Sequence, residues 1–300
     1  MKPELNSLLA QLRNRARQTG LPADAMLLLY FIEGFLARLA ASKHHDHFVL
    51  KGGLNLYSRY QAAARPTRDI DLIGRQLATD PESIKTVVRE VALIELPDGI
   101  EFETESLKAS SIIEGTATPG VRVELNARFG RAIERISLDV SFGTALQPAP
   151  VLLAFPSLLG EPHAVLGVAL ETIIAEKFAA AIEIGLQTTR YKDFFDLHKI
   201  VSSETLHAKT LRESLERTFA VRGTPLEGSA AKFEALVNNP LGAQAWTRFL
   251  TRNRLPSPGE YEQVMRWIQA MLEPLLERQV PSEARWSPEL GVWAVDPDEH

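Results

Sequence analysis

The sequence predicts an α+β protein, in which a mixed sheet with flanking helices is followed by a helical domain. Segments 68–73, 121–127 and 135–142 alternate polar and apolar residues, which is the period of a strand with one buried face. Beyond about residue 170, apolar residues recur every three or four positions, as in amphipathic helices. Residues 145–162 contain four prolines and no regular period, so we expect the chain to cross between two domains there.

These patterns divide the chain into three parts. We expect a first domain over residues 1–150, a helical domain over residues 151–280 and a tail over residues 281–300. Helical spacing over residues 4–42 predicts two helices at the start of the first domain, and Pro22 and Asp24 mark the beginning of the second helix. A chain of 300 residues is long enough for two cores of ordinary size.

Composition excludes several classes of protein. The apolar fraction of 45% and the charged fraction of 24% are typical of globular domains, and a net charge of −5 excludes a uniformly basic protein. The absence of cysteine excludes disulfides, thiolate zinc sites and a cysteine nucleophile. The early apolar segment at 26–41 contains Glu33 and Arg38 and is shorter than a membrane span, and the first residues do not resemble a signal peptide. We therefore expect a cytoplasmic protein without a membrane segment.

A glycine pair follows the first short apolar run of the chain. Residues 48–50 predict a strand, Gly52 and Gly53 predict a turn, and the residues after them predict a helix. Without side chains, the two glycines let backbone N–H groups approach phosphate oxygens at a helix N-terminus. Lys51 and Arg59 are candidates for charge-assisted contacts with the same phosphates.

Three aspartates are candidate metal ligands. Asp69 and Asp71 are two residues apart on a predicted strand and therefore share one of its faces. Asp139 lies on the polar face of a later strand, which follows the strand at 121–127 through a turn at FGR and forms a hairpin with it. Carboxylates on neighbouring strands suit magnesium, so we expect these three residues to bind two Mg²⁺ ions, with Mn²⁺ as an alternative.

Each of these features, taken alone, also fits an ordinary structural role. An Asp-X-Asp triplet arises by chance in a chain of this length, a glycine pair is more often only a turn, and Asp139 also fits a strand residue that faces water. Their order favours the functional interpretation, because a glycine turn, a helix, an acidic strand and a third acid follow one another.

This order resembles the core of the DNA polymerase beta-like nucleotidyltransferase superfamily, which has a glycine turn, an Asp-X-Asp strand and a third Asp on a later strand. Five blocks narrow the resemblance to the AbiEii toxin family of type IV toxin-antitoxin systems. They are LKGGLNLYSRY, RPTRDIDL, ISLDVSFG, ETIIAEKFAA and RYKDFFDLHKI, and they run in this order from residue 50 to residue 200. The resemblance implies that residues 1–150 form a nucleotidyltransferase domain.

The resemblance also implies site residues in the helical domain. Lys177 matches the lysine of a Glu-Lys-x-x-Ala helix, and Asp193 and Asp196 match the acids of an Arg-x-Lys-Asp-x-x-Asp-Leu block. The family then implies that these three residues act in catalysis, and that Arg190 and Lys192 contribute to nucleotide binding. Without the resemblance, polar residues on amphipathic helices are more often a solvated face.

One residue departs from the family pattern. Many members have serine or threonine after the glycine pair, whereas this chain has Leu54, which has no hydroxyl to donate to a phosphate. The substitution puts nucleotide affinity and the level of activity in question.

The family implies a substrate, an acceptor and a partner. These are a nucleoside triphosphate, the 3′ end of a tRNA whose modification halts translation, and an antitoxin encoded nearby that need not bind the toxin. The alternatives are a nucleotidyltransferase that modifies a protein or small-molecule hydroxyl, and a non-catalytic relative that binds RNA or protein. Three groups of arginines are candidate RNA contacts. They are Arg13, Arg15 and Arg17 near the start, Arg128, Arg131 and Arg135 around the hairpin turn, and Arg248, Arg252 and Arg254 late in the chain.

Overall fold

The computed structural model describes residues 5–114, 118–144 and 146–295, and the chain divides into two units. The first unit comprises residues 1–144 and 150–168, and the second comprises residues 145–149 and 169–300. The boundary therefore differs from the expected one at residue 150, because residues 150–168 pack with the first unit.

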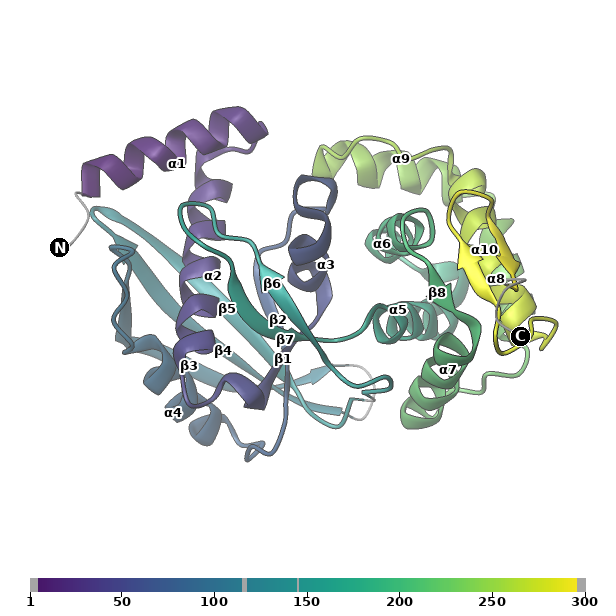
Figure 1. Ribbon diagram of the computed structural model, residues 1–300, viewed down its shortest axis with the longest axis horizontal. Coiled ribbons are helices and arrows are strands. Elements are labelled where there is room, and N and C mark those ends of the chain that lie inside the picture. Colours follow the sequence, from purple (N-terminus) through teal and green to yellow (C-terminus); the bar gives the residue numbers. More distant parts are fainter. Residues whose placement is uncertain (1–4, 115–117, 145, 296–300) are drawn as a thin grey trace. The chain divides into compact units, whose positions relative to one another are not determined.

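A mixed sheet forms the centre of the first unit (Figure 1), as the sequence predicts. Within the described residues it has seven strands in the order β3-β4-β5-β2-β1-β7-β6. The pairs β2–β5 and β1–β7 are parallel, and the other pairs are antiparallel. The strands are β1 (Phe48–Leu50), β2 (Asp69–Gly74), β3 (Glu101–Glu114), β4 (Thr118–Phe129), β5 (Ala132–Ser141), β6 (Val151–Phe155) and β7 (His163–Gly167).

Helices cover one face of this sheet. The helices of the first unit are α1 (Leu5–Thr19), α2 (Ala23–Ala41), α3 (Gly52–Tyr60) and α4 (Pro81–Ala92), with short 3₁₀ turns η1 (His45–His47) and η2 (Gln61–Ala63). Helix α2 crosses the sheet against β5 and β7, and α4 packs on β3 and β4 (Figure 1). Alternation along the strands directs Ile70, Leu72, Leu138 and Val140 into this core, where each is at most 1% exposed. The polar residues between them consequently face the opposite side.

Helix α2 is buried on nearly every side, as expected for the apolar segment at 26–41. Its Arg38 is 2% exposed, donates to Asp98 at 2.6 and 3.1 Å and to the carbonyl of Ile100 at 3.0 Å, and lies over the ring of Phe102. Its Glu33 accepts hydrogen bonds from Ser157 and from a backbone N–H, and burial raises the pKa of this carboxyl. Both buried groups therefore have hydrogen-bond partners inside the unit, although Nε of Arg38 has none among the described residues.

No single helix among the described residues is long and apolar enough to cross a membrane. Among the described helices, α1 and α2 reach that length and composition only when taken together, and the chain bends by 116° between them.

Two expectations about the chain after residue 145 need correction. The proline-rich stretch contains β6 and β7, which pair with each other and extend the sheet beyond β1. The expected tail contains β9 (Arg285–Ser287) and β10 (Val292–Ala294), which form a second sheet with β8 (Leu206–His207). Trp286 of β9 is completely buried and donates to the carbonyl of Val201 at 2.7 Å, so this segment packs into the core of the second unit.

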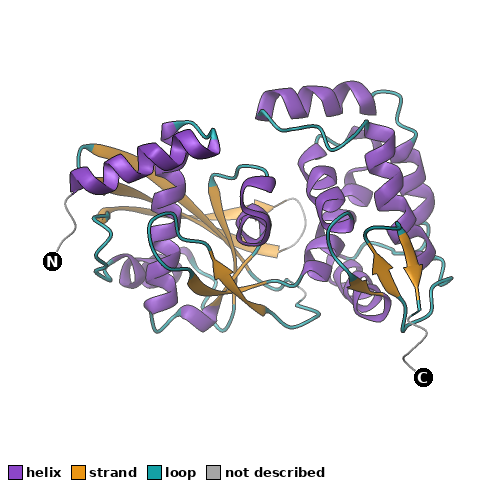
Figure 2. Ribbon diagram, turned by 45° about the horizontal axis from the view of Figure 1, so that its top comes forward, coloured by secondary structure: helices purple, strands orange, loops and turns teal. Residues whose placement is uncertain are grey.

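The second unit is mainly helical (Figure 2), as predicted. Helix α5 packs on α7, and α10 packs on α6 and α8. The cluster of Phe178, Phe219 and Phe233 joins α5, α7 and α8. The helices are α5 (Leu170–Ile184), α6 (Tyr191–Val201), α7 (Ala208–Arg222), α8 (Ser229–Val237), α9 (Gly242–Asn253) and α10 (Tyr261–Leu276), with the 3₁₀ turn η3 (Gly185–Gln187).

Candidate active site

The three aspartates of the first unit lie on the open face of the sheet. Strands β2 and β5 are parallel neighbours, and Asp71 is directly opposite Asp139 in their register, at a strand spacing of about 4.8 Å. Asp69 precedes Asp71 by two residues and so lies on the same face. Asp69 is exposed, Asp71 is half-buried and Asp139 is buried. We call Asp69, Asp71 and Asp139 the carboxylate face.

The predicted strand, glycine turn and helix are present beside this face. Gly52 begins α3 with φ +64°, and the backbone N–H of Lys51 donates to the carbonyl of Asp71 at 2.9 Å. A methyl group on Gly52 would lie 2.3 Å from Oδ2 of Asp71, and one on Gly53 would lie 2.8 Å from Cβ of Thr67. Glycine is therefore required at both positions for close approach, and at Gly52 also for backbone conformation.

Leu54 and Arg59 follow this turn on α3. Leu54 is fully buried in the core of the first unit, so its side chain does not point toward solvent. Arg59 is near the C-terminal end of α3, but its side chain runs back along the helix toward the first turn, where its Nη2 donates to the carbonyl of Val168 at 3.5 Å. There it donates to Asn55 at 3.1 Å. Its predicted contact with phosphate stays a prediction.

Arg122 on β4 lies beside the carboxylate face, and no pattern in the sequence marks it as a site residue. It is directly opposite Asp139 in the β4–β5 hairpin. Its Nε donates to Oδ1 of Asp139 at 2.7 Å, and its Nη2 donates to Oδ2 at 2.6 Å. These hydrogen bonds, with the negative charges of Asp139, Asp69 and Glu124, raise the pKa of the Arg122 guanidinium, so it is always charged.

The donor chemistry of these carboxylates bears on the metal prediction. Across residues 5–114, 118–144 and 146–295, no group of three or more acidic, histidine or cysteine side chains converges closely enough to hold an ion. At Asp139, both carboxylate oxygens accept hydrogen bonds from Arg122. The donors themselves fit a hard divalent cation, since three carboxylates share one face on adjacent strands. The three carboxylates therefore fit the donor chemistry of magnesium, and its binding here stays a prediction.

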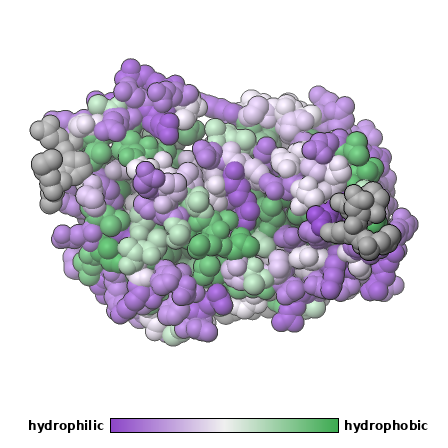
Figure 3. Space-filling view, in the orientation of Figure 1, coloured by the Kyte–Doolittle hydropathy of each residue, from purple (hydrophilic) through white to green (hydrophobic). Residues whose placement is uncertain are grey.

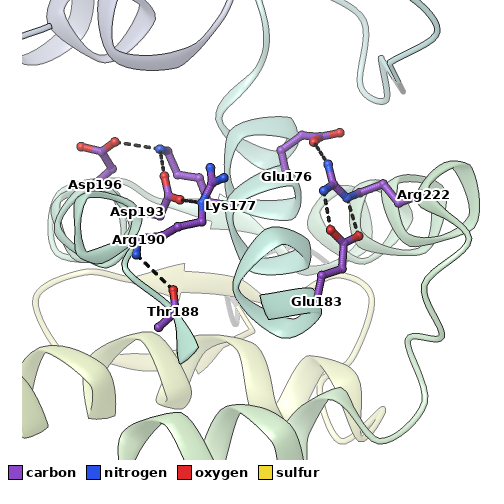
Figure 4. Close-up of polar contacts among 8 residues, drawn as sticks. All are labelled: Glu176, Lys177, Glu183, Thr188, Arg190, Asp193, Asp196 and Arg222. Carbon is purple, nitrogen blue, oxygen red and sulfur yellow. Dashed lines mark hydrogen bonds and ion pairs between the residues drawn. The ribbon is translucent and has the colours of Figure 1, made fainter. Parts of the chain in front are cut away.

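A second cluster lies in the second unit, between α5 and α6 (Figure 4), and we call it the lysine cluster. Nζ of Lys177 donates to Oδ1 of Asp193 and to Oδ2 of Asp196, both at 2.7 Å. Nε of Arg190 donates to the other oxygen of Asp193 at 2.5 Å. Lys177 is 8% exposed, Asp193 1% and Asp196 2%, so the charges are paired away from water. The structure thus brings together four of the five residues expected here, whereas Lys192 is exposed on α6.

The two cations determine the ionisation of Asp193. Burial alone would raise the pKa of this carboxyl, but the charges of Lys177 and Arg190 and their hydrogen bonds outweigh burial and bring it to about 2. Asp193 is therefore ionised at neutral pH and keeps the ammonium group of Lys177 in one place.

Another charged cluster joins α5 to α7 on a different side of α5 (Figure 4). Arg222 donates to Glu176 at 2.9 Å and to both oxygens of Glu183, the nearer at 2.5 Å. Its hydrogen bonds lower the pKa of Glu183, and Thr224 donates to the same carboxylate. Glu176 thus holds two helices together and does not join the lysine cluster.

A mixed sheet that places carboxylates on adjacent parallel strands beside a glycine turn is the arrangement expected of a nucleotidyltransferase core. The sequence matches the family described as "Nucleotidyl transferase AbiEii toxin, Type IV TA system" over residues 34–267. The chain belongs to this family, which confirms the resemblance seen in the sequence blocks.

Solved structures agree with this fold. The crystal structure of JHP933 from Helicobacter pylori superposes with a TM-score of 0.52 at 15% sequence identity, over 86% of this chain and 96% of that one. A second H. pylori structure, described as a "putative nucleotidyltransferase", superposes with a TM-score of 0.50 at 15% identity, over 86% of this chain and 97% of that one. No curated protein sequence matches the chain.

Proposed function

We propose that this nucleotidyltransferase transfers a nucleoside monophosphate from a nucleoside triphosphate to the 3′ end of a tRNA, which blocks aminoacylation and halts translation. The observation that carries the proposal is the register of Asp71 with Asp139 beside Gly52. It gathers metal-binding carboxylates and the N-terminus of α3, and a nucleoside triphosphate with its ions needs both. We place the reaction in the cytoplasm, where both substrates occur.

The proposed reaction is an in-line displacement at the α-phosphorus. The acceptor hydroxyl oxygen forms a bond to this phosphorus, the bond to the bridging oxygen breaks, and pyrophosphate leaves. The hydroxyl proton passes to a carboxylate of the first unit. Lys51 and the first backbone N–H groups of α3 bind phosphate oxygens, for which a helix N-terminus is suited.

Asp69, Asp71 and Asp139 would hold magnesium in this reaction. When bound, two magnesium ions, or manganese in their place, supply positive charge that offsets the charge of the triphosphate. The lysine cluster contributes a fixed ammonium group, because Asp193 and Asp196 orient Lys177. A cation near phosphate stabilises the charge that develops during transfer.

Exposed arginines support an RNA acceptor. Helix α1 contains Arg13, Arg15 and Arg17 and no acidic residue, and these arginines form no ion pair with any described residue. Figure 3 shows a hydrophilic outer surface over α1. Arg248, Arg252 and Arg254 of the second unit are likewise exposed and unpaired within the described chain. Arg128 and Arg135, in contrast, pair with Glu103 and Glu124. Unpaired cations are available for a phosphate backbone.

The family also supports a genetic partner. We propose that an antitoxin is encoded beside this protein, as in other type IV systems, without requiring that the two proteins bind each other.

The test is a transfer assay with each labelled nucleoside triphosphate, magnesium and total tRNA. The protein is compared with Asp71→Asn, which keeps the side-chain shape but removes the charge. The matched control is Asp24→Asn, an exposed acid at the start of α2. Label on tRNA with the parent and the control, but not with Asp71→Asn, supports the proposal. Label on the protein itself favours the modification of a protein hydroxyl, and no label with any acceptor favours a non-catalytic relative.

A further inference from the structure

We infer that helix α9 binds single-stranded RNA, with Phe249 stacking on a base while Arg248 and Arg252 bind phosphates. The inference rests on the proposed function, because it assigns a surface to the RNA acceptor, and the 3′ end of a tRNA is single-stranded. It concerns the second unit alone, within which α9 packs on α6 (Figure 1).

Helix α9 belongs to a basic segment of an acidic protein. Residues 235–259 contain three arginines and no acidic residue, whereas the whole chain has a net charge of −5. Arg248 and Arg252 are exposed and lie four residues apart, so they share one face of the helix. Like charges at this spacing destabilise a helix, and neither arginine forms an ion pair with a side chain that the structure describes.

The helix dipole accounts for only one of these two cations. It favours a positive charge in the last turn, where Arg252 lies, but its effect does not extend to Arg248 one turn earlier. The repulsion between the two arginines is thus not offset within the described part of the second unit. Phosphate groups would supply the missing negative charge.

Phe249 follows Arg248 directly, and neighbouring rings fix its orientation. Its ring stacks on Trp246 with a centroid distance of 5.7 Å and an interplanar angle of 27°, and its centroid is 6.3 Å from that of Phe195 on α6. Trp246 is 2% exposed, and its indole N–H donates to the carbonyl of Gly259 at 3.1 Å. Phe249 itself remains partly exposed. A ring that is already fixed can stack with a base at little cost in conformational entropy.

This ring beside two arginines favours a single strand over other anions. In a duplex the bases stack on one another, so an aromatic side chain finds no open base face. In a single strand the base faces are open, and stacking on an aromatic ring combines with phosphate contacts from cations. An acidic protein segment would pair with Arg248 and Arg252 but would leave Phe249 without a planar partner.

The contact between α9 and α6 places this surface beside the helix that carries part of the lysine cluster. Phe195, which contacts the ring of Phe249, precedes Asp196, whose carboxylate accepts from Lys177 at 2.7 Å. Lys192 is exposed three residues before Phe195 and therefore lies on the same side of α6. A strand bound on α9 would thus lie one helix away from the lysine cluster.

The experiment measures binding to the full-length protein by fluorescence anisotropy over a range of salt concentrations. The main probe is a labelled single-stranded RNA of about 12 nucleotides. The same sequence as a blunt duplex, total tRNA and a labelled polyglutamate peptide are the comparison probes. Together they separate base stacking from a general attraction of anions.

The variants separate the ring from the charges. Phe249→Leu removes the ring but keeps an apolar side chain, and Phe249→Tyr keeps a ring. Arg248→Gln combined with Arg252→Gln removes both charges of α9. The charge-matched control combines Lys209→Gln with Arg217→Gln, which removes two exposed cations of α7 in the same unit. Circular dichroism melts confirm that each variant is folded.

We expect Phe249→Leu to bind the single strand about tenfold more weakly and Phe249→Tyr to bind it like the parent. The duplex should bind to the parent and to Phe249→Leu with affinities within about twofold of each other. The double variant of α9 should lower the slope of log K against log salt by about 1.4, since each phosphate contact on a single strand contributes about 0.7. The double variant of α7 should leave this slope nearly unchanged.

Unchanged binding in Phe249→Leu overturns the inference, as does an equal loss in Phe249→Tyr or on the duplex, because the ring then does not stack on an open base. A slope lowered equally by the α7 variant, or polyglutamate bound as tightly as RNA, would show only attraction of anions and also overturns it. If all α9 variants bind tRNA as tightly as the parent does, the inference fails and the proposed function stands. If the parent binds neither the single strand nor tRNA, both fail.

Discussion

Replacing Gly52 with alanine tests whether the position of the Asp71 carboxylate matters. The added methyl group would lie 2.3 Å from Oδ2 of Asp71, about 1 Å inside a normal contact distance. The methyl group would also lie 3.0 Å from Cγ and 3.2 Å from Cβ of Asp71, so rotation alone does not relieve the contact and the side chain must shift. A displacement of about 1 Å in a catalytic group lowers the rate about 100-fold. The main expected effect of Gly52→Ala is therefore on activity.

The backbone of Gly52 adds a separate cost. Its φ of +64° is in the left-handed region, where alanine costs about 1 kcal/mol in the free energy of unfolding. Gly20 provides a matched control in the same unit. Its φ is +71°, and within the described residues nothing lies within 4 Å of an added methyl group. Gly20→Ala should thus show the backbone cost without the displacement of Asp71.

The assay combines urea unfolding with initial rates of nucleotide transfer. Both variants should lose about 1 kcal/mol of unfolding free energy, and only Gly52→Ala should lose about 100-fold in rate. Equal transfer rates in the two variants would refute the reasoning, because the carboxylate could then move without consequence.

Three further predictions follow from other parts of the structure. Leu54→Ser should lower the unfolding free energy by about 3 kcal/mol in urea titrations, because the leucine is fully buried, and it should not tighten nucleotide binding; tighter binding would show that the side chain at this position reaches the phosphates. Asp193 has a pKa of about 2, below its ordinary value of 3.8, so its ionised form stabilises the fold above about pH 4 and this contribution is lost as the pH falls toward 2. The unfolding free energy of Asp193→Asn at pH 7 should therefore be about 2 kcal/mol lower than that of the parent. Between pH 7 and pH 3, urea unfolding should show a smaller decrease in unfolding free energy for the variant than for the parent. The same pH dependence in both proteins would contradict this prediction. Replacing the three arginines of α1 with glutamine should weaken tRNA binding and reduce its dependence on salt, measured as the slope of log K against log salt, by about 2; Arg128→Gln, which removes an arginine already paired with Glu103, should leave the slope nearly unchanged.

Alternation in the sequence was sufficient to predict much of the carboxylate face. Because side chains alternate strictly along a strand, Asp69 and Asp71 had to share a face, and the buried neighbours of Asp139 placed it on the polar side of its strand. The parallel pairing of β2 with β5 could not be derived in this way. It depends on strand order, and no local pattern in the sequence encodes strand order.

The role of Arg122 could have been found by counting along the hairpin. The turn between Phe129 and Ala132 has two residues, and counting outward from it places Arg122 opposite Asp139. The sequence alone did not fix this turn length, because FGR also fits a longer loop. The hydrogen bonds to both oxygens of Asp139 depend further on side-chain conformation, which periodicity does not predict.

The strands missed after residue 145 are short and unusual in composition. Strand β6 lies at the edge of the sheet between Pro150 and Pro156, and Leu152 on it is 71% exposed, so neither alternation nor burial marks it clearly. Strands β9 and β10 have three residues each, which is too few for a period to be recognised. Trp286 of β9 is buried in the second unit, and this burial is visible only in the assembled fold.

The central claim is that Asp71 and Asp139 act as one unit, and a double-mutant cycle on single-turnover nucleotide transfer tests it most directly. We expect Asp71→Asn and Asp139→Asn each to lower the rate at least about 1000-fold, and the double variant to be no slower than the slower single variant, because either loss disables the shared site. Losses that multiply, or one variant that transfers at the parent rate, would show that the two carboxylates act separately and would contradict the account.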